Sequence, residues 1–147
     1  MNTSVFSNSC QLSFRRRLLL GACGAGLAGL LVVAASLHPN PAGLGTHEQL
    51  GLPPCTFRSL FGIRCPSCGM TTSWSHATHG HWRQALAANV GGTLLAVVAV
   101  VVATVCVISA VRGRWLVKIP NDWVWATGAL ALAAITLLDW AIRLATG

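Results

Sequence analysis

Three of the six cysteines lie in one polar segment of the chain, at Cys55, Cys65 and Cys68. The last two belong to the string Cys-Pro-Ser-Cys-Gly. Two cysteines separated by two residues can hold one tetrahedral metal ion, because the turn between them directs both sulfurs the same way. A glycine directly after the second cysteine, here Gly69, permits a positive φ and leaves backbone N–H groups free to donate to the sulfurs. The string therefore supplies half of a zinc-type site.

A complete structural zinc site needs four ligands, so two more must come from elsewhere in the segment. Cys55 is the natural third ligand. His76 and His79 lie three residues apart, which places them on one face of a short helix that can point back toward the cysteines. We therefore expect a zinc-like ion bound by Cys55, Cys65, Cys68 and His76, with His47, His79 and His81 as the other candidates for the fourth position.

The same string also suits thiol–disulfide exchange. A Cys-Pro-x-Cys at a helix start lowers the pKa of its first thiol, because the helix dipole and free N–H groups favour the thiolate. Cys65 and Cys68 would then be the redox pair of a membrane oxidoreductase, with Cys55 as a resolving thiol. A third interpretation is an accessory subunit whose loop is merely stapled by a disulfide. The residues leave these alternatives open, and a non-catalytic metal-binding protein is the leading hypothesis.

Other reaction classes lack the residues that they need. The chain has only three acidic residues, which leaves almost no scope for paired carboxylates. We find no Ser/His/Asp set and no phosphate-binding loop in the sequence. No catalytic residue is assigned outside the alternative redox pair.

The elements that must position the cysteines are three long apolar runs. Hydrophobic residues make up 54% of the chain and charged residues only 9%, against ~25% charged in a soluble globular protein. Residues 18–37, 90–111 and 123–145 can each cross a bilayer of ~30 Å as a helix. We predict an all-α integral membrane protein with three transmembrane helices. A Cys/His loop with a short interfacial helix, residues 38–89, connects the first two.

Six basic residues lie just before the first run or between the second and third, against three arginines, Arg58, Arg64 and Arg83, spread over the longer loop. Residues 1–17 form a basic tail that ends in three arginines, and residues 112–122 form a basic link. The positive-inside rule places both in the cytoplasm and the cysteine loop outside it. The first run exceeds a typical signal-peptide core of about 7–15 residues, so we expect it to be retained. The partners expected are the lipid bilayer and another membrane protein or a second copy, and not nucleic acid.

Local signals predict further detail. A short helix is expected to start near Met70 or Thr71, with Thr71 or Thr72 as its N-cap and Gly80 as its stop. A second helix is expected to run from His81 straight into the second span. In the third span, Asp139 and Arg143 are spaced to pair and to anchor the helix near the interface, where Trp140 also lies.

The loop resembles a bacterial family of small membrane proteins of unknown function, whose signature has the form P-C-x-F…G-x-x-C-P-x-C-G-x-T-R. The matching segments are Pro54 to Phe57 and Gly62 to Thr71. With His38-Pro39 and Asn89 the resemblance covers residues 38–89. Two positions differ, since Thr72 replaces the usual arginine and Gly80-His81 replaces Gly-Asp. The resemblance implies a bacterial cell membrane and a shared cysteine loop, and it implies no reaction.

Overall fold

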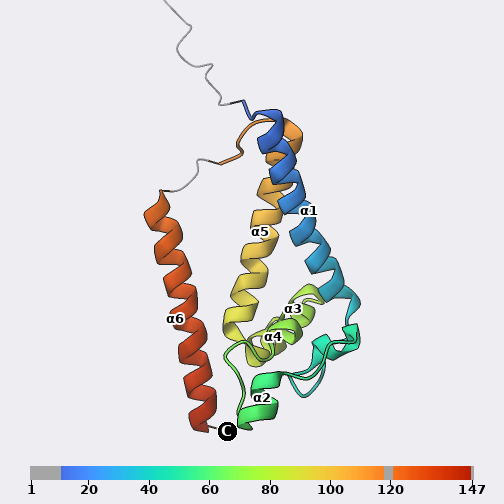
Figure 1. Cartoon of the computed structure of the whole chain (residues 1–147), viewed down its shortest axis with the longest axis vertical. Coiled ribbons are helices and arrows are strands. Elements are labelled where there is room, and N and C mark those ends of the chain that lie inside the picture. The colour runs from blue at the N-terminus through green and yellow to red at the C-terminus, as the bar shows by residue number, and fades with distance from the viewer. Residues whose placement is uncertain (1–10, 118–120, 147) are drawn as a thin grey trace, which may run out of the picture.

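The computed structural model describes residues 11–117 and 121–146. Every regular element in these ranges is a helix, apart from one isolated bridge between Gln11 and Arg114. The predictions made for the first ten residues of the basic tail, and for residues 118–120 of the basic link, lie outside the described residues. The helices, shown in Figure 1, are α1 (Phe14–Ser36), the 3₁₀ helix η1 (Thr46–Leu50), α2 (Thr56–Phe61), α3 (Met70–Thr78), α4 (Trp82–Ala88), α5 (Val90–Arg112) and α6 (Asp122–Thr146).

Three of these helices, α1, α5 and α6, are long and apolar enough to cross a membrane. They have 23, 23 and 25 residues, with mean hydropathies of 2.3, 3.0 and 1.6. Short helices fill the connection between the first and the second. The predicted fold class, an all-α membrane protein with three spans and a helical loop, is confirmed.

Helices α1 and α5 pack antiparallel at the end that carries the arginines. The Arg17 Nε donates to the carbonyl oxygen of Ala110 at 2.9 Å, and the backbone N–H of Leu12 donates to that of Gly113 at 2.9 Å. About two helical turns further along α1, Gly24 allows close contact with α5, because a Cβ there would lie 2.7 Å from the Val107 Cγ2. The described parts of the two basic segments, residues 11–17 and 112–117, therefore lie at one end of the molecule, as the charge pattern predicts.

At the other end, α3 and α4 fill the space between the diverging α1 and α5 (Figure 1). The fully buried Ser75 hydroxyl donates to the carbonyl oxygen of Leu37 at 2.7 Å, which ties α3 to the end of α1. A small apolar core, Ala77, Ala85 and Ala96, joins α3, α4 and α5. This end of the bundle supports the cysteine loop.

The predicted continuous helix from His81 into the second span is wrong. α4 ends at Ala88, and Asn89 is extended with φ −165° and ψ 115° before α5 starts at Val90. The physical reason is that asparagine bonds to nearby backbone groups in non-helical conformations, and here its side chain caps α5.

The predicted N-cap of α3 is also wrong, although Met70 is its first residue. Gly69 holds the cap position in the left-handed conformation. Thr72 is buried instead, and its Oγ1 lies 2.8 Å from the Thr46 Oγ1 on η1. The stop at Gly80, with φ 77°, follows α3 as expected.

Helix α6 approaches α5 only near the cysteine loop and lies apart from it at the opposite end (Figure 1). Thr136 meets Gly91, where a side chain would collide with the threonine. The predicted pair of Asp139 and Arg143 is confirmed, with the Arg143 Nε 2.9 Å from the Asp139 Oδ2. Contacts of α6 are thus concentrated at one end of the bundle.

Replacing Gly24 with alanine is expected to destabilise the packing of α1 on α5. The new Cβ would lie 3.1 Å from the Val107 backbone nitrogen and 3.2 Å from the Ala103 oxygen, and backbone atoms yield little. We expect a loss of about 1–3 kcal/mol, typical of overpacking, measured by denaturation of the detergent-solubilised protein. The matched control is Gly26→Ala, because a Cβ there meets no described atom within 4 Å. Equal stability of the two variants would contradict this packing.

Candidate metal centre

The sulfurs of Cys55, Cys65 and Cys68 lie together, all within 4.8 Å of one another. The Cys65 Sγ is 3.0 Å from the Cys68 Sγ and 3.5 Å from the Cys55 Sγ. Two sulfurs bound at ~2.3 Å to one tetrahedral ion are about 3.8 Å apart, whereas a disulfide is about 2.05 Å long. All three are free thiols. Both distances lie closer to the spacing around an ion than to a disulfide bond.

The two ends of the cluster come from different local structures. Cys55 directly precedes α2, and its carbonyl oxygen accepts the backbone N–H of Ser59 at 3.0 Å, the first bond of that helix. Cys65 and Cys68 form a turn in which the Cys68 N–H donates to the Cys65 oxygen at 3.0 Å. The turn leads at once into α3, so a short helix follows each side of the cluster.

Gly69 is required immediately after this turn for two reasons. Its φ of 84° is one that side chains disfavour. A Cβ would also lie 2.6 Å from the carbonyl oxygen of Ala88 and 2.8 Å from that of Gly43. The turn is therefore pressed against the end of α4 and against the segment that precedes η1.

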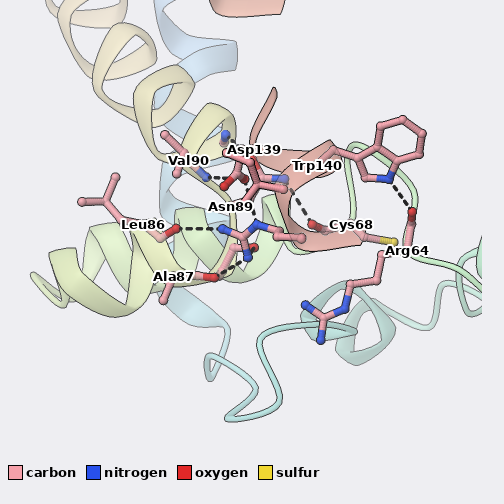
Figure 2. A network of polar contacts seen from close by, with 12 residues as sticks. Arg64, Cys68, Leu86, Ala87, Asn89, Val90, Asp139 and Trp140 are labelled. Carbon is pink, nitrogen blue, oxygen red and sulfur yellow. Dashed lines mark hydrogen bonds and ion pairs between the residues drawn. The ribbon is translucent and has the colours of Figure 1, made fainter. Parts of the chain in front are cut away.

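Asn89 fixes the cysteine turn to the start of the second span (Figure 2). Its buried amide Nδ2 donates to the carbonyl oxygens of Pro66 at 3.2 Å and Cys68 at 3.1 Å. Its Oδ1 accepts the backbone N–H of Gly92 at 2.7 Å and so caps α5. One side chain thus ties the turn to a transmembrane helix.

Helix α6 supports the same junction from the other side (Figure 2). The Trp140 Nε1 donates to the Arg64 carbonyl oxygen at 2.6 Å, next to the first cysteine of the turn. The Arg143 guanidinium donates to the carbonyl oxygens that end α4, those of Leu86 at 3.1 Å, Ala87 and Ala88 at 3.2 Å. Helix ends leave such carbonyls without intrahelical partners. Sequence reasoning gave these α6 residues an anchoring role and missed their contacts with the loop.

The cluster borders a cavity of about 610 Å³. His47, Glu48 and Arg58 line it together with the three cysteines. The His47 Nε2 lies 3.2 Å from the carbonyl oxygen of Pro53. A ligand in this cavity would therefore reach both the sulfurs and polar side chains of η1 and α2.

The thiols of the turn differ in acidity. Burial raises the pKa of Cys65, but hydrogen bonds from Cys68, Ser67 and Cys55 outweigh this and leave the pKa below its ordinary value. Burial and the neighbouring Cys65 raise the pKa of Cys68 to about 12. Of the two thiols in the turn, Cys65 is therefore the more acidic, and its sulfur lies 3.0 Å and 3.5 Å from those of Cys68 and Cys55.

His76, the expected fourth ligand, lies elsewhere. It lines a different cavity with Pro41, Arg64 and Gln84, and its ring centroid is 5.9 Å from that of His81. Burial, followed by the nearby His81 and His79, lowers the pKa of His76. Its Nδ1 is buried without a hydrogen-bond partner among the described residues. The structure brings together the three predicted cysteines and places His47, rather than His76, at their cavity.

Replacing Asn89 with aspartate is expected to separate its two roles. The carboxylate keeps an acceptor for the Gly92 N–H but loses the donors to Pro66 and Cys68. We expect faster hydrogen exchange in residues 65–70 with α5 unchanged. Asn89→Ala should loosen both, because it removes a cap of ~1 kcal/mol and leaves buried carbonyls unpaired at ~1–3 kcal/mol. Unchanged exchange of the turn in Asn89→Asp would show that the amide does not hold it.

A family model matches part of the cysteine loop and part of the second span. No curated protein and no solved structure matches the chain. The family model covers residues 55–103, one third of the chain, which includes the three cysteines, Asn89 and α5 as far as Ala103. That family is described as a protein of unknown function (DUF2752).

Proposed function

We propose that this chain is a non-catalytic membrane protein whose loop binds one zinc-type ion through Cys55, Cys65 and Cys68. The observation that carries the proposal is the meeting of three free thiols within 4.8 Å, from two separate parts of the loop. Thiolates are soft ligands that select zinc and similar ions. The Ser67 hydroxyl, 3.4 Å from the Cys65 Sγ, and the Ser67 backbone N–H give that sulfur the outer hydrogen bonds that tune such sites.

The fourth ligand is open to two proposals. The sequence favours His76, because its helix follows the cysteine turn directly. The cavity favours His47, because it lines the same space as the three sulfurs. We propose His47 as the ligand to test first and keep His76 as its rival.

Such an ion would act structurally. It would join the start of α2 to the turn that begins α3, and Asn89 joins that turn to α5. The loop would then be fixed on the ends of the spans. The clustering of the arginines at the opposite end supports placing the loop outside the cytoplasm of a bacterial cell, by the positive-inside rule.

Elemental analysis of detergent-purified protein tests the site. We expect near-stoichiometric zinc or iron in the wild type and none in the Cys65→Ser/Cys68→Ser variant, because removing two thiolates leaves too few ligands. The control is Cys106→Ser, a cysteine inside α5. His47→Ala is expected to weaken retention of the ion against a chelator, whereas His76→Ala should not. Wild-type protein that is free of metal after purification without chelators would overturn the proposal.

Thiol–disulfide exchange remains the second candidate, favoured by the 3.0 Å approach of Cys65 and Cys68 at the start of α3. In such a cycle the Cys65 thiolate attacks a substrate disulfide and one substrate thiolate leaves. The Cys68 thiolate then attacks the mixed disulfide, releasing the second substrate thiol and leaving an intramolecular disulfide. The substrate is thereby reduced, and the cysteine pair is oxidised.

Trapping distinguishes this cycle from a metal site. If exchange is the function, Cys68→Ser should accumulate a mixed disulfide at Cys65, because the resolving thiol is gone, and Cys65→Ser should accumulate none. On the metal proposal we expect neither variant to trap a partner. Non-reducing electrophoresis with mass spectrometry of the Cys65 peptide measures the difference. A Cys65 adduct specific to Cys68→Ser would decide for the redox function, and an oxidised Cys65–Cys68 pair in all purified protein would favour a stapled loop.

A further inference from the structure

A second cavity, of about 410 Å³, lies between the cysteine loop and the C-terminal end of α6. Arg58, Arg64 and Arg143 line it, from α2, the following loop and α6 respectively. The hydroxyl-bearing Thr146 and the apolar Leu144 complete the α6 side. Figure 1 shows α2 beside this end of α6. Segments far apart in the sequence therefore bring three guanidinium-bearing residues to one space.

This cavity has an excess of positive charge. Arg143 is paired with Asp139 at 2.9 Å, but Arg58 and Arg64 have no ion pair in the part of the chain that the structure describes. Neither of the two other acidic residues lines this cavity: Glu48 lines the cysteine cavity, which it shares with Arg58 without an ion pair, and Asp122 lies at the opposite end of α6. A guanidinium group can donate two parallel hydrogen bonds to the oxygens of one phosphate, and arginine is therefore common in phosphate sites. The cavity is thus suited to a phosphate group.

The surroundings of the cavity are apolar and exposed. On α2, Leu60 and Phe61 are 72% and 64% exposed, and Ile63 follows them at 43%. Leu144 of α6 is exposed at the same place. Apolar side chains at the end of a membrane-crossing helix, next to cations, are the composition of a segment that lies in the membrane interface. A molecule that carries its phosphate into this cavity would also contact these exposed apolar side chains, which we call the apolar rim.

We propose that the cavity between α2 and α6 binds the phosphate of an anionic phospholipid headgroup. Arg58 and Arg64 hold the phosphate, Arg143 adds charge while it caps α4, and the exposed side chains of α2 lie among the acyl chains. A free phosphate ion would use the same arginines but would gain nothing from the apolar rim. The proposal does not depend on the metal site. Arg58 lines the cysteine cavity as well as this one, and Arg64 also lines the cavity that contains His76.

Lipid retention measured by native mass spectrometry tests the site. The full chain is reconstituted in nanodiscs of phosphatidylcholine with phosphatidylglycerol. The lipid that stays bound after the protein is released from the nanodisc in the mass spectrometer is identified. We expect retained phosphatidylglycerol for the wild type. Binding should weaken roughly fivefold in Arg58→Gln and about thirtyfold in Arg58→Gln/Arg64→Gln at low salt, as each cation near an anionic membrane surface contributes.

The matched control is Arg83→Gln, because Arg83 on α4 is also an exposed arginine between the first two spans but does not line the cavity. Unchanged thermal stability and helix content by circular dichroism show that each variant is folded. A second variant, Leu60→Ser/Phe61→Ser, should weaken lipid retention with all arginines present. Equal retention of phosphatidylcholine, equal loss in Arg83→Gln, or displacement of the lipid by inorganic phosphate would each overturn the proposal, the last in favour of a free phosphate ion.

Discussion

The amide of Asn89 is the contact on which the arrangement of the loop depends. A buried amide has two donor hydrogens and one acceptor oxygen, and all of them are used here. The acceptor starts α5, and the donors hold the two carbonyls of the cysteine turn. Because burial makes an unpaired polar group costly, the amide has one favourable orientation. A transmembrane helix and a polar loop are thereby aligned by a single residue that interrupts the helix.

Small residues make this alignment possible. Gly69 lets the turn approach the end of α4, and Gly91 and Gly92 let α6 and α3 approach the first turn of α5. Each contact brings backbone to within a side chain's width of its neighbour. The loop is therefore held on the ends of the transmembrane helices by close packing as well as by hydrogen bonds. This packing fixes the positions of the cysteines.

The sequence was sufficient for the long apolar helices, the Asp139–Arg143 pair and the start of α3 at Met70, although it misplaced the N-cap of α3. Hydropathy predicted the three long helices, and the arginines predicted that the N-terminal tail and the link between α5 and α6 lie at the same end. The Cys-Pro-Ser-Cys-Gly string predicted the turn that brings Cys65 and Cys68 together. What it missed depends on contacts between distant segments. The break at Asn89 follows from carbonyls of the cysteine turn, twenty-odd residues earlier. The separation of His76 from the sulfurs follows from the way α3 packs on α5, and helical spacing fixes only which residues share a face. His47 lies at the cysteine cavity because it belongs to η1, a helix that the sequence patterns did not predict.

The contacts of α6 have a consequence for the order of assembly. Trp140 and Arg143 bind carbonyls of residues that precede them by 76 and by up to 57 positions. During synthesis the loop is made before this helix, so the Arg143 donors reach the carbonyls at the end of α4 only after α6 has been made. They are satisfied only when α6 has crossed the membrane in the opposite direction to α5 and brought its C-terminal end to the loop. A third helix inserted the opposite way would leave these carbonyls without the Arg143 guanidinium, so the contacts favour the orientation in which α6 ends at the loop.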